Sequence, residues 1–214
     1  MMNTIRIHPT ALVEKYVEIG DGTSVWDNVH IRSGARIGRD CIVGGKTYIA
    51  GGTRIGDRVK INASVYIPAG VTIEDGVMIA AHTVFTNDRF PRACTPDLAS
   101  LLPSEPDEHT RPTVVREGAT IGANCTIGND LTIGRFAMIG MGSVVTKSVR
   151  DFHLAIGSPA RPVGVVCRCG QPLFKFSEAM PREGQPVSCV HCGWNYRAMG
   201  GTVEDLLESA AEAA

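Results

Sequence analysis

Residues 49–85 read IAGGTRIGDRVKINASVYIPAGVTIEDGVMIAAHTVF and place an aliphatic residue or Phe at every sixth position. The same spacing runs without a miss from Ile7 to Phe85, which gives fourteen consecutive positions. It returns over six more positions from Val115 to Val145. A small or β-branched residue stands two positions earlier, as Thr53 does before Ile55, and Gly often follows directly. Chance does not produce such a run, so the chain is built from a repeated six-residue unit.

Side chains that point inward at every second position are typical of a β-strand. A Gly- or Asn-rich pair every six residues bends the chain. One unit is therefore a short strand plus a corner. Because such a unit cannot bury its apolar side alone, successive units must coil and stack as a β-helix. If three units close a triangular coil, residues 18 apart stack in columns, and twenty units give about 6 to 7 coils, or about 32 Å. The periodicity does not fix the hand of the coil.

Composition narrows the functional class. The chain has 21 basic and 22 acidic residues, so we expect neither nucleic acid nor an anionic membrane as the main partner. No apolar run is long enough to span a bilayer, and the polar start lacks a signal-peptide core. These features predict a cytoplasmic protein. An odd count of seven cysteines without an export signal argues against a disulfide framework.

The six-residue repeat is interrupted at residues 89–112, RFPRACTPDLASLLPSEPDEHTRP, which contain five prolines. An excursion of this length from a compact repeat is usually functional or disordered. If the loop leaves one corner and the hexads resume in register, Ile127 stacks on Phe85. His82 and Asn87 fall at or near corners just before the loop, where they can meet a ligand outside the coil. The alternative is that both side chains only cap turns.

After Gly164 the hexads end and two cysteine pairs follow. Cys167 and Cys169 are separated from Cys189 and Cys192 by nineteen residues, and a Gly follows each pair. This pattern indicates two knuckles of a four-cysteine, zinc-ribbon-like module at 165–200, although the first pair has one intervening residue instead of two. Such a zinc would be structural, since four thiolates leave no open position. Vacant thiols or adventitious disulfides are the alternative.

Several segments carry a resemblance to a known family. The hexads resemble those of the left-handed β-helix, or hexapeptide-repeat, acyltransferases. IHPTALVE, VKINASVYIPAGVTIEDGV, HTVFTNDRFPR, PTVVREGATIGANCTIG, IGMGSVVTKSV and GSPARPVG together are similar to nucleotide-sugar N-acetyltransferases that acylate a 3-amino hexose or hexuronate. The resemblance covers the first three quarters of the chain. It implies an all-β, left-handed parallel β-helix, a homotrimer with sites between subunits, acetyl-CoA as co-substrate and a role in polysaccharide biosynthesis.

The resemblance also implies roles for residues near the loop. Asn87 of the FTND motif would orient the sugar amine, because an amide has no basic nitrogen but its carbonyl can accept an N–H bond. His82 is the rival candidate, as a general base. Arg92 would bind the diphosphate or a sugar carboxylate, and the alternative is a solvated surface charge.

Other substrate contacts are less specific. Lys60 and Asn62 resemble a polar stretch that the family carries before its loop, although Lys60 equally fits a solvated surface charge. His30 faces outward and would line either the site or the trimer interface.

The last hexads would form the acetyl-CoA end. Gly140, Gly142 and Ser143 would let the pantetheine approach the backbone. Lys147 and Arg161 would meet the phosphates.

We therefore expect a β-helix acyltransferase domain at 1–164 with a loop at 89–112, a cysteine module at 165–200 and an acidic tail at 201–214, with a short helix over 203–214. Three other functions remain open. An O-acetyltransferase acting on serine or a sugar hydroxyl would need a clearer His base. A β-helical carbonic anhydrase would need three zinc histidines. A noncatalytic trimeric binding or assembly module would need neither.

Overall fold

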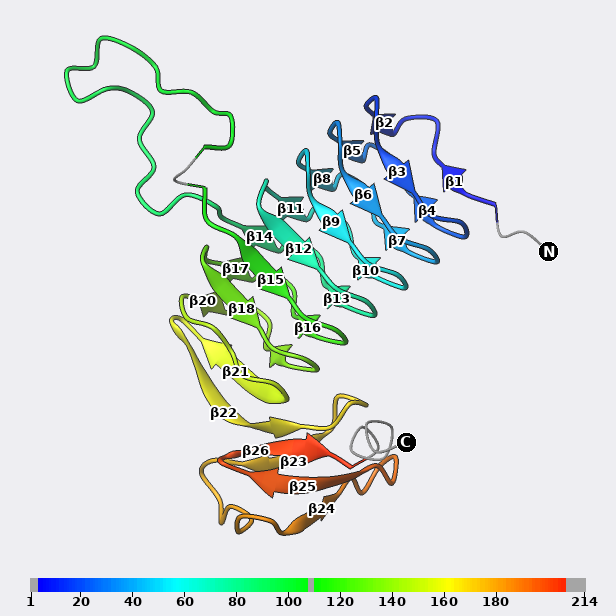
Figure 1. Ribbon diagram of the computed structural model, residues 1–214, viewed down its shortest axis with the longest axis vertical. Helices are drawn as coiled ribbons and strands as arrows, with labels where there is room; N and C mark the ends of the chain where they lie inside the picture. The colour runs from blue at the N-terminus through cyan, green and yellow to red at the C-terminus, as the bar shows by residue number, and fades with distance from the viewer. Residues whose placement is uncertain (1–3, 108–109, 207–214) are drawn as a thin grey trace.

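The computed structural model describes residues 4–107 and 110–206, and the regular elements in this part of the chain are β-strands (Figure 1). Strands β1 to β20 succeed one another around a three-sided coil, so every third strand lies on the same face. None of the described residues form a helix long and apolar enough to cross a membrane. The predicted β-solenoid of stacked parallel coils is confirmed, and it is consistent with the left-handed β-helix that the resemblance implies.

Three sheets form the faces of the solenoid. The first face carries, in spatial order, β1 Arg6–Ile7, β4 Ser24–Val25, β7 Ile42–Val43, β10 Lys60–Ile61, β13 Met78–Ile79, β16 Thr120–Ile121 and β19 Met138–Ile139. The second face carries β2 Leu12–Val13, β5 His30–Ile31, β8 Tyr48–Ile49, β11 Tyr66–Ile67, β14 Val84–Phe85, β17 Thr126–Ile127 and β20 Val144–Val145. The third face carries β3 Glu18–Ile19, β6 Arg36–Ile37, β9 Arg54–Ile55, β12 Val71–Ile73, β15 Thr113–Val115 and β18 Leu131–Ile133.

Stacking follows the predicted register. Ile31 pairs with Ile49, and Ile49 with Ile67, each step being 18 residues. Across the loop, Phe85 pairs with Ile127, as predicted. From Val25 to Val145 the inward aliphatic residues form one continuous buried core, in which Ile49, Ile61 and Ile127 are fully buried. The 6 to 7 strands on each face of the described solenoid match the predicted number of coils.

The three corners need left-handed backbone. At the first corner, between the first and second faces, the left-handed residues repeat once per coil: Asn28, Lys46, Ser64, His82, Asn124 and Gly142, with φ between 53° and 70°. The second corner lies between the second and third faces, and the third corner between the third and first. The left-handed conformation is sterically unfavourable for most residues other than Gly, Asn and Asp. The need to close each coil therefore determines the conformation at residues such as Lys46 and His82, and their local preference does not.

A hairpin ends the solenoid. Strands β21 His153–Gly157 and β22 Ala160–Val166 pair antiparallel, and β23 Pro172–Lys175 extends the same sheet. The expected domain boundary at residue 164 therefore falls inside β22.

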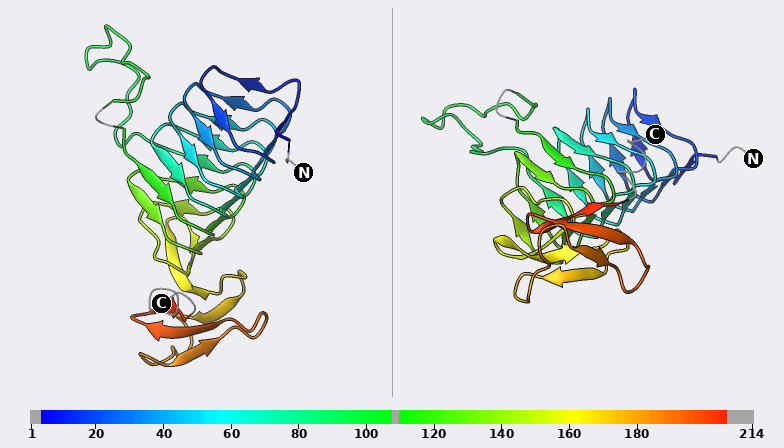
Figure 2. Two further views of the ribbon diagram at one scale, coloured as in Figure 1. Left: turned by 45° about the vertical axis from the view of Figure 1, so that its right-hand side comes forward. Right: turned by 60° about the horizontal axis from the view of Figure 1, so that its bottom comes forward.

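The C-terminal strands β24 Pro186–Ser188, β25 Asn195–Met199 and β26 Thr202–Asp205 form a separate antiparallel sheet against the end of the solenoid (Figure 2). The expectation of a helix over 203–214 is wrong for residues 203–205, which lie in β26. Val203 and Asp205 alternate inward and are buried, and β26 pairs with β25 along its length. Residues 201–206 therefore belong to the module. The remainder of the expected tail, 207–214, lies outside the described residues.

Candidate active site

The long loop leaves the solenoid at the second corner and returns to the same corner (Figure 1). A bridge between Asp88 and Thr110 closes its stem. The amide of Arg111 donates to the carbonyl of Asn87 at 2.9 Å, and the coil resumes when Thr113 pairs with Val71. The solenoid thus absorbs the insertion without losing register, and the loop stands beside the second face.

A cavity of about 1370 Å³ separates the loop from the second face. Its wall on the solenoid includes Tyr48, Tyr66, Ala69 and Asn87, and the loop supplies the opposite wall with residues 88–93, 101–107 and 110–111. The cavity is large enough for a ligand of nucleotide-sugar size, since small-molecule sites are commonly about 300 to 1,000 Å³. Asn87 and Arg92, two of the predicted site residues, are brought together here.

Asn87 is half-buried where the loop begins. Its Nδ2 donates to the carbonyl of Ala69 at 3.4 Å. This contact uses the amide nitrogen and so orients the side-chain carbonyl as an acceptor. The geometry suits the expected role of accepting an N–H bond from an amine.

Outward aromatic residues on the second face were missed by the sequence analysis. Tyr48 and Tyr66 stack with ring centroids 5.1 Å apart and an interplanar angle of 9°, and both line the cavity. Tyr66 is 45% exposed, so part of its side chain is accessible to a ligand. The available signal was the 18-residue spacing of His30, Tyr48 and Tyr66, which places all three on one outward column.

His30 does not line the cavity but lies behind it. Its ring meets Tyr48 edge-on at 5.4 Å, and its Nε2 lies 2.8 Å from Oε1 of Glu14. Glu14 also pairs with Arg32 at 2.7 Å and accepts from the amide of Ser33 at 2.9 Å. The Ser33 amide and then His30 lower the pKa of Glu14 below its ordinary value. His30 therefore helps to hold the Glu14–Arg32 pair on the cavity wall.

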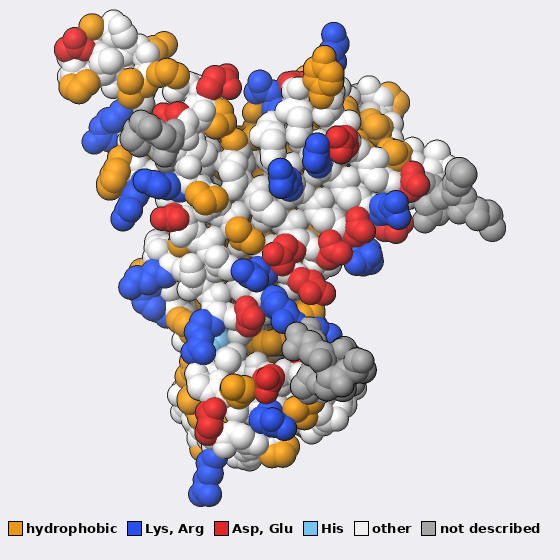
Figure 3. Space-filling view, viewed as in Figure 1, with side chains coloured by type: hydrophobic (Ala, Val, Ile, Leu, Met, Phe, Trp, Pro, Cys, Tyr) orange, Lys and Arg blue, Asp and Glu red, His pale blue; other side chains and the backbone are white. Residues whose placement is uncertain are grey.

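Charges of both signs surround the cavity. The basic side chains are Arg32, Arg89, Arg92 and Arg111, and the acidic ones are Glu14, Asp88, Glu105 and Asp107. Figure 3 shows basic side chains (blue) gathered along the stem of the loop. Arg92 is exposed, and its guanidinium donates only to the neighbouring carbonyl of Pro91 at 3.0 Å among the described contacts. Arginines placed in this way can bind phosphate or carboxylate groups.

A second group of predicted residues lies at the first corner. His82 is exposed there with φ 60°, and its amide donates to Ala63 at 3.1 Å. Asn62 precedes the same corner one coil earlier, and Lys60 is exposed on β10 of the first face. None of these three lines the cavity beside Asn87.

The predicted acetyl-CoA residues Gly140, Gly142 and Ser143 lie at the same first corner, on the coil two above His82. The backbone ladder connects them, since Asn124 donates to Ala81 at 3.0 Å and Gly142 to Ala123 at 2.8 Å. A Cβ at Gly142 would meet nothing within 4 Å, which marks an open surface.

The side chain of Ser143 makes its contacts within the fold. It is fully buried, and its hydroxyl donates to Gly140 at 2.7 Å and accepts from the amide of Gly157 at 3.1 Å. It therefore closes the corner onto the β21–β22 turn. A Cβ at Gly140 would lie 2.5 Å from Cγ2 of Ile156, so this glycine also serves packing.

The two predicted phosphate ligands are exposed but separate. Lys147 follows Val145 by two residues as Asn87 follows Phe85, so it leaves the second face at the second corner. Arg161 lies on β22 opposite Ile156, at the hairpin that ends the solenoid. Its guanidinium donates to the carbonyl of Ala160 at 2.9 Å.

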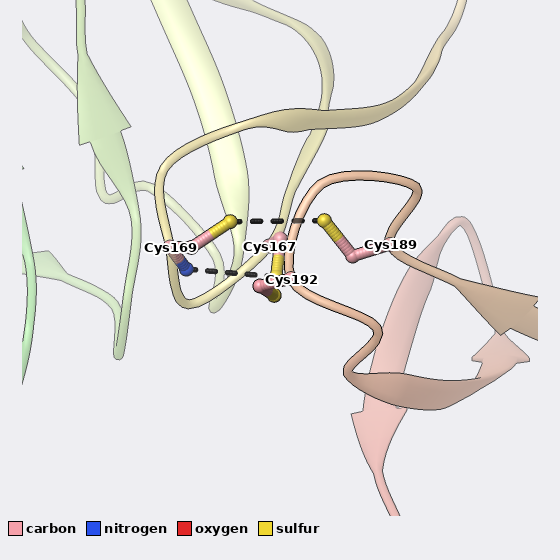
Figure 4. Close-up of side chains that lie close together, drawn as sticks. All are labelled: Cys167, Cys169, Cys189 and Cys192. Atoms are coloured by element: carbon pink, nitrogen blue, oxygen red, sulfur yellow. Dashed lines mark hydrogen bonds between the residues drawn. The ribbon is translucent and has the colours of Figure 1, made fainter.

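The four C-terminal cysteines lie together (Figure 4). Their sulfur atoms are all within 4.8 Å of one another, the one such group of possible metal ligands among the described residues. None of the four lines the cavity beside Asn87.

Residues 16–51, 52–87 and 112–147 match the family model described as bacterial transferase hexapeptide (six repeats). Residues 34–69 also match a model described as hexapeptide repeat of succinyl-transferase. The three segments of the first match follow the coils and omit the loop and the cysteine module.

Among curated relatives, the dTDP-3-amino-3,6-dideoxy-alpha-D-galactopyranose 3-N-acetyltransferase of Aneurinibacillus thermoaerophilus is 40% identical over 95 residues. The match covers 44% of this chain and 45% of that protein. The acyl-[acyl-carrier-protein]–UDP-N-acetylglucosamine O-acyltransferase of Brucella ovis is 63% identical over 35 residues, which cover 16% of this chain and 13% of the relative. The chain thus matches less than half the length of either.

Among solved structures, a mutant GDP-perosamine N-acetyl transferase from Caulobacter crescentus, in complex with CoA and GDP-perosamine, is 22% identical with a TM-score of 0.48. The similarity covers 77% of this chain and 58% of that one.

Proposed function

This chain belongs to the bacterial transferase hexapeptide family, and from that membership we propose that it transfers an acetyl group from acetyl-CoA to the amino group of a nucleotide-linked amino sugar. The observation that carries the proposal is the cavity beside the second face, where Asn87 shares a wall with a stacked pair of tyrosines, opposite a loop with several arginines. The relative from Aneurinibacillus thermoaerophilus, named as a 3-amino-sugar N-acetyltransferase, supports the choice of acceptor.

The cavity offers complementary chemistry for each part of such an acceptor. The exposed part of the Tyr66 ring can contact a nucleobase. Arg92 and Arg111 can pair with a diphosphate or a hexuronate carboxylate. Asn87 can accept an N–H bond and aim the lone pair of the amine, a positioning effect that is lost with small displacements. A 3-amino hexose or hexuronate is the acceptor that this proposal favours.

The reaction needs no metal. The amine attacks the thioester carbonyl, the new C–N bond forms as the C–S bond breaks, and the amine proton passes to the departing CoA thiolate. A thiol pKa of about 8.5 permits that transfer near neutral pH. The cysteine module takes no part, because four thiolates around a zinc ion would leave no open position.

The placement of the candidate residues supports association of subunits. Asn87 and Lys147 lie at the second corner, whereas His82, Asn62 and Gly142 lie at the first. A second corner set against the first corner of a neighbouring copy would combine both groups. Repetition of this head-to-tail contact around a threefold axis gives a closed homotrimer with its sites between subunits.

Lys60 and His30 remain secondary candidates in this arrangement. Lys60 is exposed on the first face and would contact the acceptor only from a neighbouring copy. His30 would act through Glu14 and Arg32. Arg161 and Lys147 would meet the phosphates of acetyl-CoA, while Gly140 and Gly142 would border the pantetheine.

An O-acyltransferase is the second candidate, because the Brucella ovis relative carries that name and His82 is exposed at the first corner. A hydroxyl acceptor would require His82 as a general base, because the oxygen of an alcohol is a weaker nucleophile than the nitrogen of a neutral amine.

The decisive experiment incubates the full chain with acetyl-CoA and a panel of UDP- and dTDP-linked amino sugars, with free thiol as the readout. Each amino sugar is matched by its hydroxyl counterpart. We expect thiol release with one or more 3-amino sugars and none with the hydroxyl counterparts. Release only with hydroxyl acceptors would support the O-acyltransferase. No release together with no CoA binding would contradict both and favour a noncatalytic assembly module.

A further inference from the structure

The cysteine cluster joins two turns that are distant in sequence. Cys167 and Cys169 lie in the turn between β22 and β23, and Cys189 and Cys192 lie in the turn between β24 and β25 (Figure 4). The separation of Cys167 Sγ and Cys192 Sγ is 3.5 Å, and that of Cys169 Sγ and Cys189 Sγ is 3.7 Å. Each short pair therefore links one turn to the other.

These distances fit the edges of a metal–thiolate tetrahedron. A Zn–S length of about 2.3 Å requires neighbouring sulfur atoms to be about 3.8 Å apart. A disulfide requires about 2.05 Å between sulfur atoms, far shorter than either separation here. Because the four sulfur atoms all lie within 4.8 Å of one another, a single ion can reach every thiolate. The donor set is soft, which selects zinc over calcium or magnesium.

Backbone and side-chain donors surround one ligand. The amide of Cys169 donates to Cys167 Sγ at 3.5 Å, and the hydroxyl of Tyr196 lies 3.1 Å from the same sulfur. Tyr196 also accepts from the amide of Arg168 at 2.9 Å, so its free hydroxyl hydrogen is directed to the sulfur. Donors of this kind orient metal ligands and stabilise thiolate charge.

The cluster has a buried and an open side. Cys167 and Cys189 are 1% and 3% exposed, whereas Cys169 and Cys192 are exposed. An ion can therefore enter from solvent and complete a site whose inner half is already packed into the module.

The same module contacts the end of the solenoid. Arg150 donates to the carbonyl of Gly200 at 3.0 Å, and the hydroxyl of Thr202 donates to the carbonyl of Asp151 at 2.8 Å. Phe152 of the solenoid packs with Cys167, Cys189 and Tyr196 in one buried cluster. The two cysteine turns are thus part of the core that fastens the module to the last coil.

We propose that Cys167, Cys169, Cys189 and Cys192 form a structural tetrathiolate zinc site that fastens the C-terminal module to the last coil of the solenoid. Zinc holds the β22–β23 turn against the β24–β25 turn, and Tyr196 transmits that constraint to Phe152. This proposal does not depend on acyl transfer, since none of the four cysteines lines the cavity beside Asn87.

The first test is metal content of the full chain purified under reducing conditions. We expect about one zinc per chain in the wild type and in Cys94→Ser, a control cysteine in the loop. Cys192→Ser, which changes an exposed ligand, should lose at least nine tenths of the metal. The proposal would be overturned if the wild-type chain held no zinc after incubation with zinc, or if Cys94→Ser and Cys192→Ser lost the same amount of metal. Two intramolecular disulfides among the four cysteines in freshly purified protein would also overturn it.

If Cys192→Ser does not fold, a second set of measurements on the wild-type chain still tests the site. In wild-type protein loaded with cobalt, a tetrathiolate site gives intense visible absorption that zinc displaces. Alkylation of Cys169 and Cys192 should be slow in the zinc-loaded chain and fast after chelation. Equal alkylation rates with and without chelator, or no cobalt spectrum, would contradict the site.

The fastening role has its own readout. Trp194 donates to Asp205 at 3.0 Å and lies beside the Cys192 turn, so its fluorescence reports on the module. Trp26→Phe removes the other tryptophan of the chain. Chelation should shift Trp194 emission in Trp26→Phe, and zinc should restore it. Tyr196→Phe should keep the site but weaken zinc affinity about 10- to 100-fold. If the Trp194 emission spectrum did not change after complete removal of zinc, the proposal that zinc fastens the module to the solenoid would be wrong.

Discussion

Asn87 and His82 lie at different corners of one coil, with β14 between them. Five residues of extended chain span about 16 Å, more than the two side chains can bridge. One chain therefore cannot present both residues to a single amine. Either only one of them acts on the acceptor, or a neighbouring subunit supplies the other.

Replacement of Asn87 tests the orienting role. Asn87→Ala should lower the single-turnover rate of acetyl transfer about 100-fold, because the amine loses its acceptor and its alignment. His82→Asn, which keeps a residue tolerant of the left-handed corner, should change the rate much less. Acetyl-CoA affinity should be unaffected in Asn87→Ala. A large loss confined to His82→Asn would reverse the assignment and make histidine the base.

Removal of the Tyr66 ring tests the nucleotide end of the cavity. A stacked base loses about 1 to 3 kcal/mol when its aromatic partner becomes alanine. Tyr66→Ala should therefore raise KM for the nucleotide sugar about 5- to 150-fold with little change in kcat. Tyr66→Phe preserves the ring and is the control. An equal rise in both variants would point to the hydroxyl instead of stacking.

The fold was predictable because every inward position must carry an apolar side chain that packs in the core, and these positions recur every six residues. The spacing of Ile31, Ile49 and Ile67 fixed their pairing, and it survived the loop so that Phe85 still meets Ile127. Burial on every coil imposes this pattern, which the sequence therefore displays.

The outward and terminal contacts were less predictable. The Tyr48–Tyr66 stack lies on a surface where the fold itself requires no particular residue, so only function or association selects it. Asp205 was assigned to an acidic tail, yet it is 3% exposed because Trp194 and Arg168 pair with it. The location of Arg92 opposite the second face depends on the path of a proline-rich loop that has no repeat.

Lys147 gives a test of the acetyl-CoA end. A hydrogen bond to a charged group contributes about 1.5 to 3 kcal/mol, so Lys147→Ala should raise KM for acetyl-CoA about 10- to 150-fold. The effect should shrink as salt increases. Lys15→Ala, an exposed lysine near the other end of the solenoid, should leave KM unchanged. An unaltered KM in Lys147→Ala would remove this residue from the phosphate site.

Gly118 should be among the least replaceable corner residues. A Cβ there would lie 2.2 Å from the Phe136 ring, which is held by a stack on Phe152 and by Arg168 at 4.4 Å. Gly52 has similar left-handed backbone, but a Cβ would meet nothing within 4 Å. Gly52→Ala should cost about 1 to 2 kcal/mol from backbone strain alone. Gly118→Ala should cost about 1 to 3 kcal/mol more through overpacking, measured by thermal or urea unfolding. Equal losses would mean that the ring moves aside freely.

His153 should make the junction between solenoid and module sensitive to acid. Burial, and then the charge of Arg150, lower its pKa from the ordinary 6.5. The unfolded chain therefore takes up a proton at a higher pH than the folded chain does. Stability should be constant for this group above pH 6.5 and fall as the pH drops toward the folded pKa, with a slope of at most about 1.4 kcal/mol per pH unit. Unfolding midpoints of wild type and His153→Gln between pH 7.5 and 5 measure the effect. The variant keeps a donor for the carbonyl of Gly201, which His153 Nε2 contacts at 3.2 Å, but does not titrate. Its midpoint should decline less steeply, and parallel curves would assign the acid sensitivity to other groups.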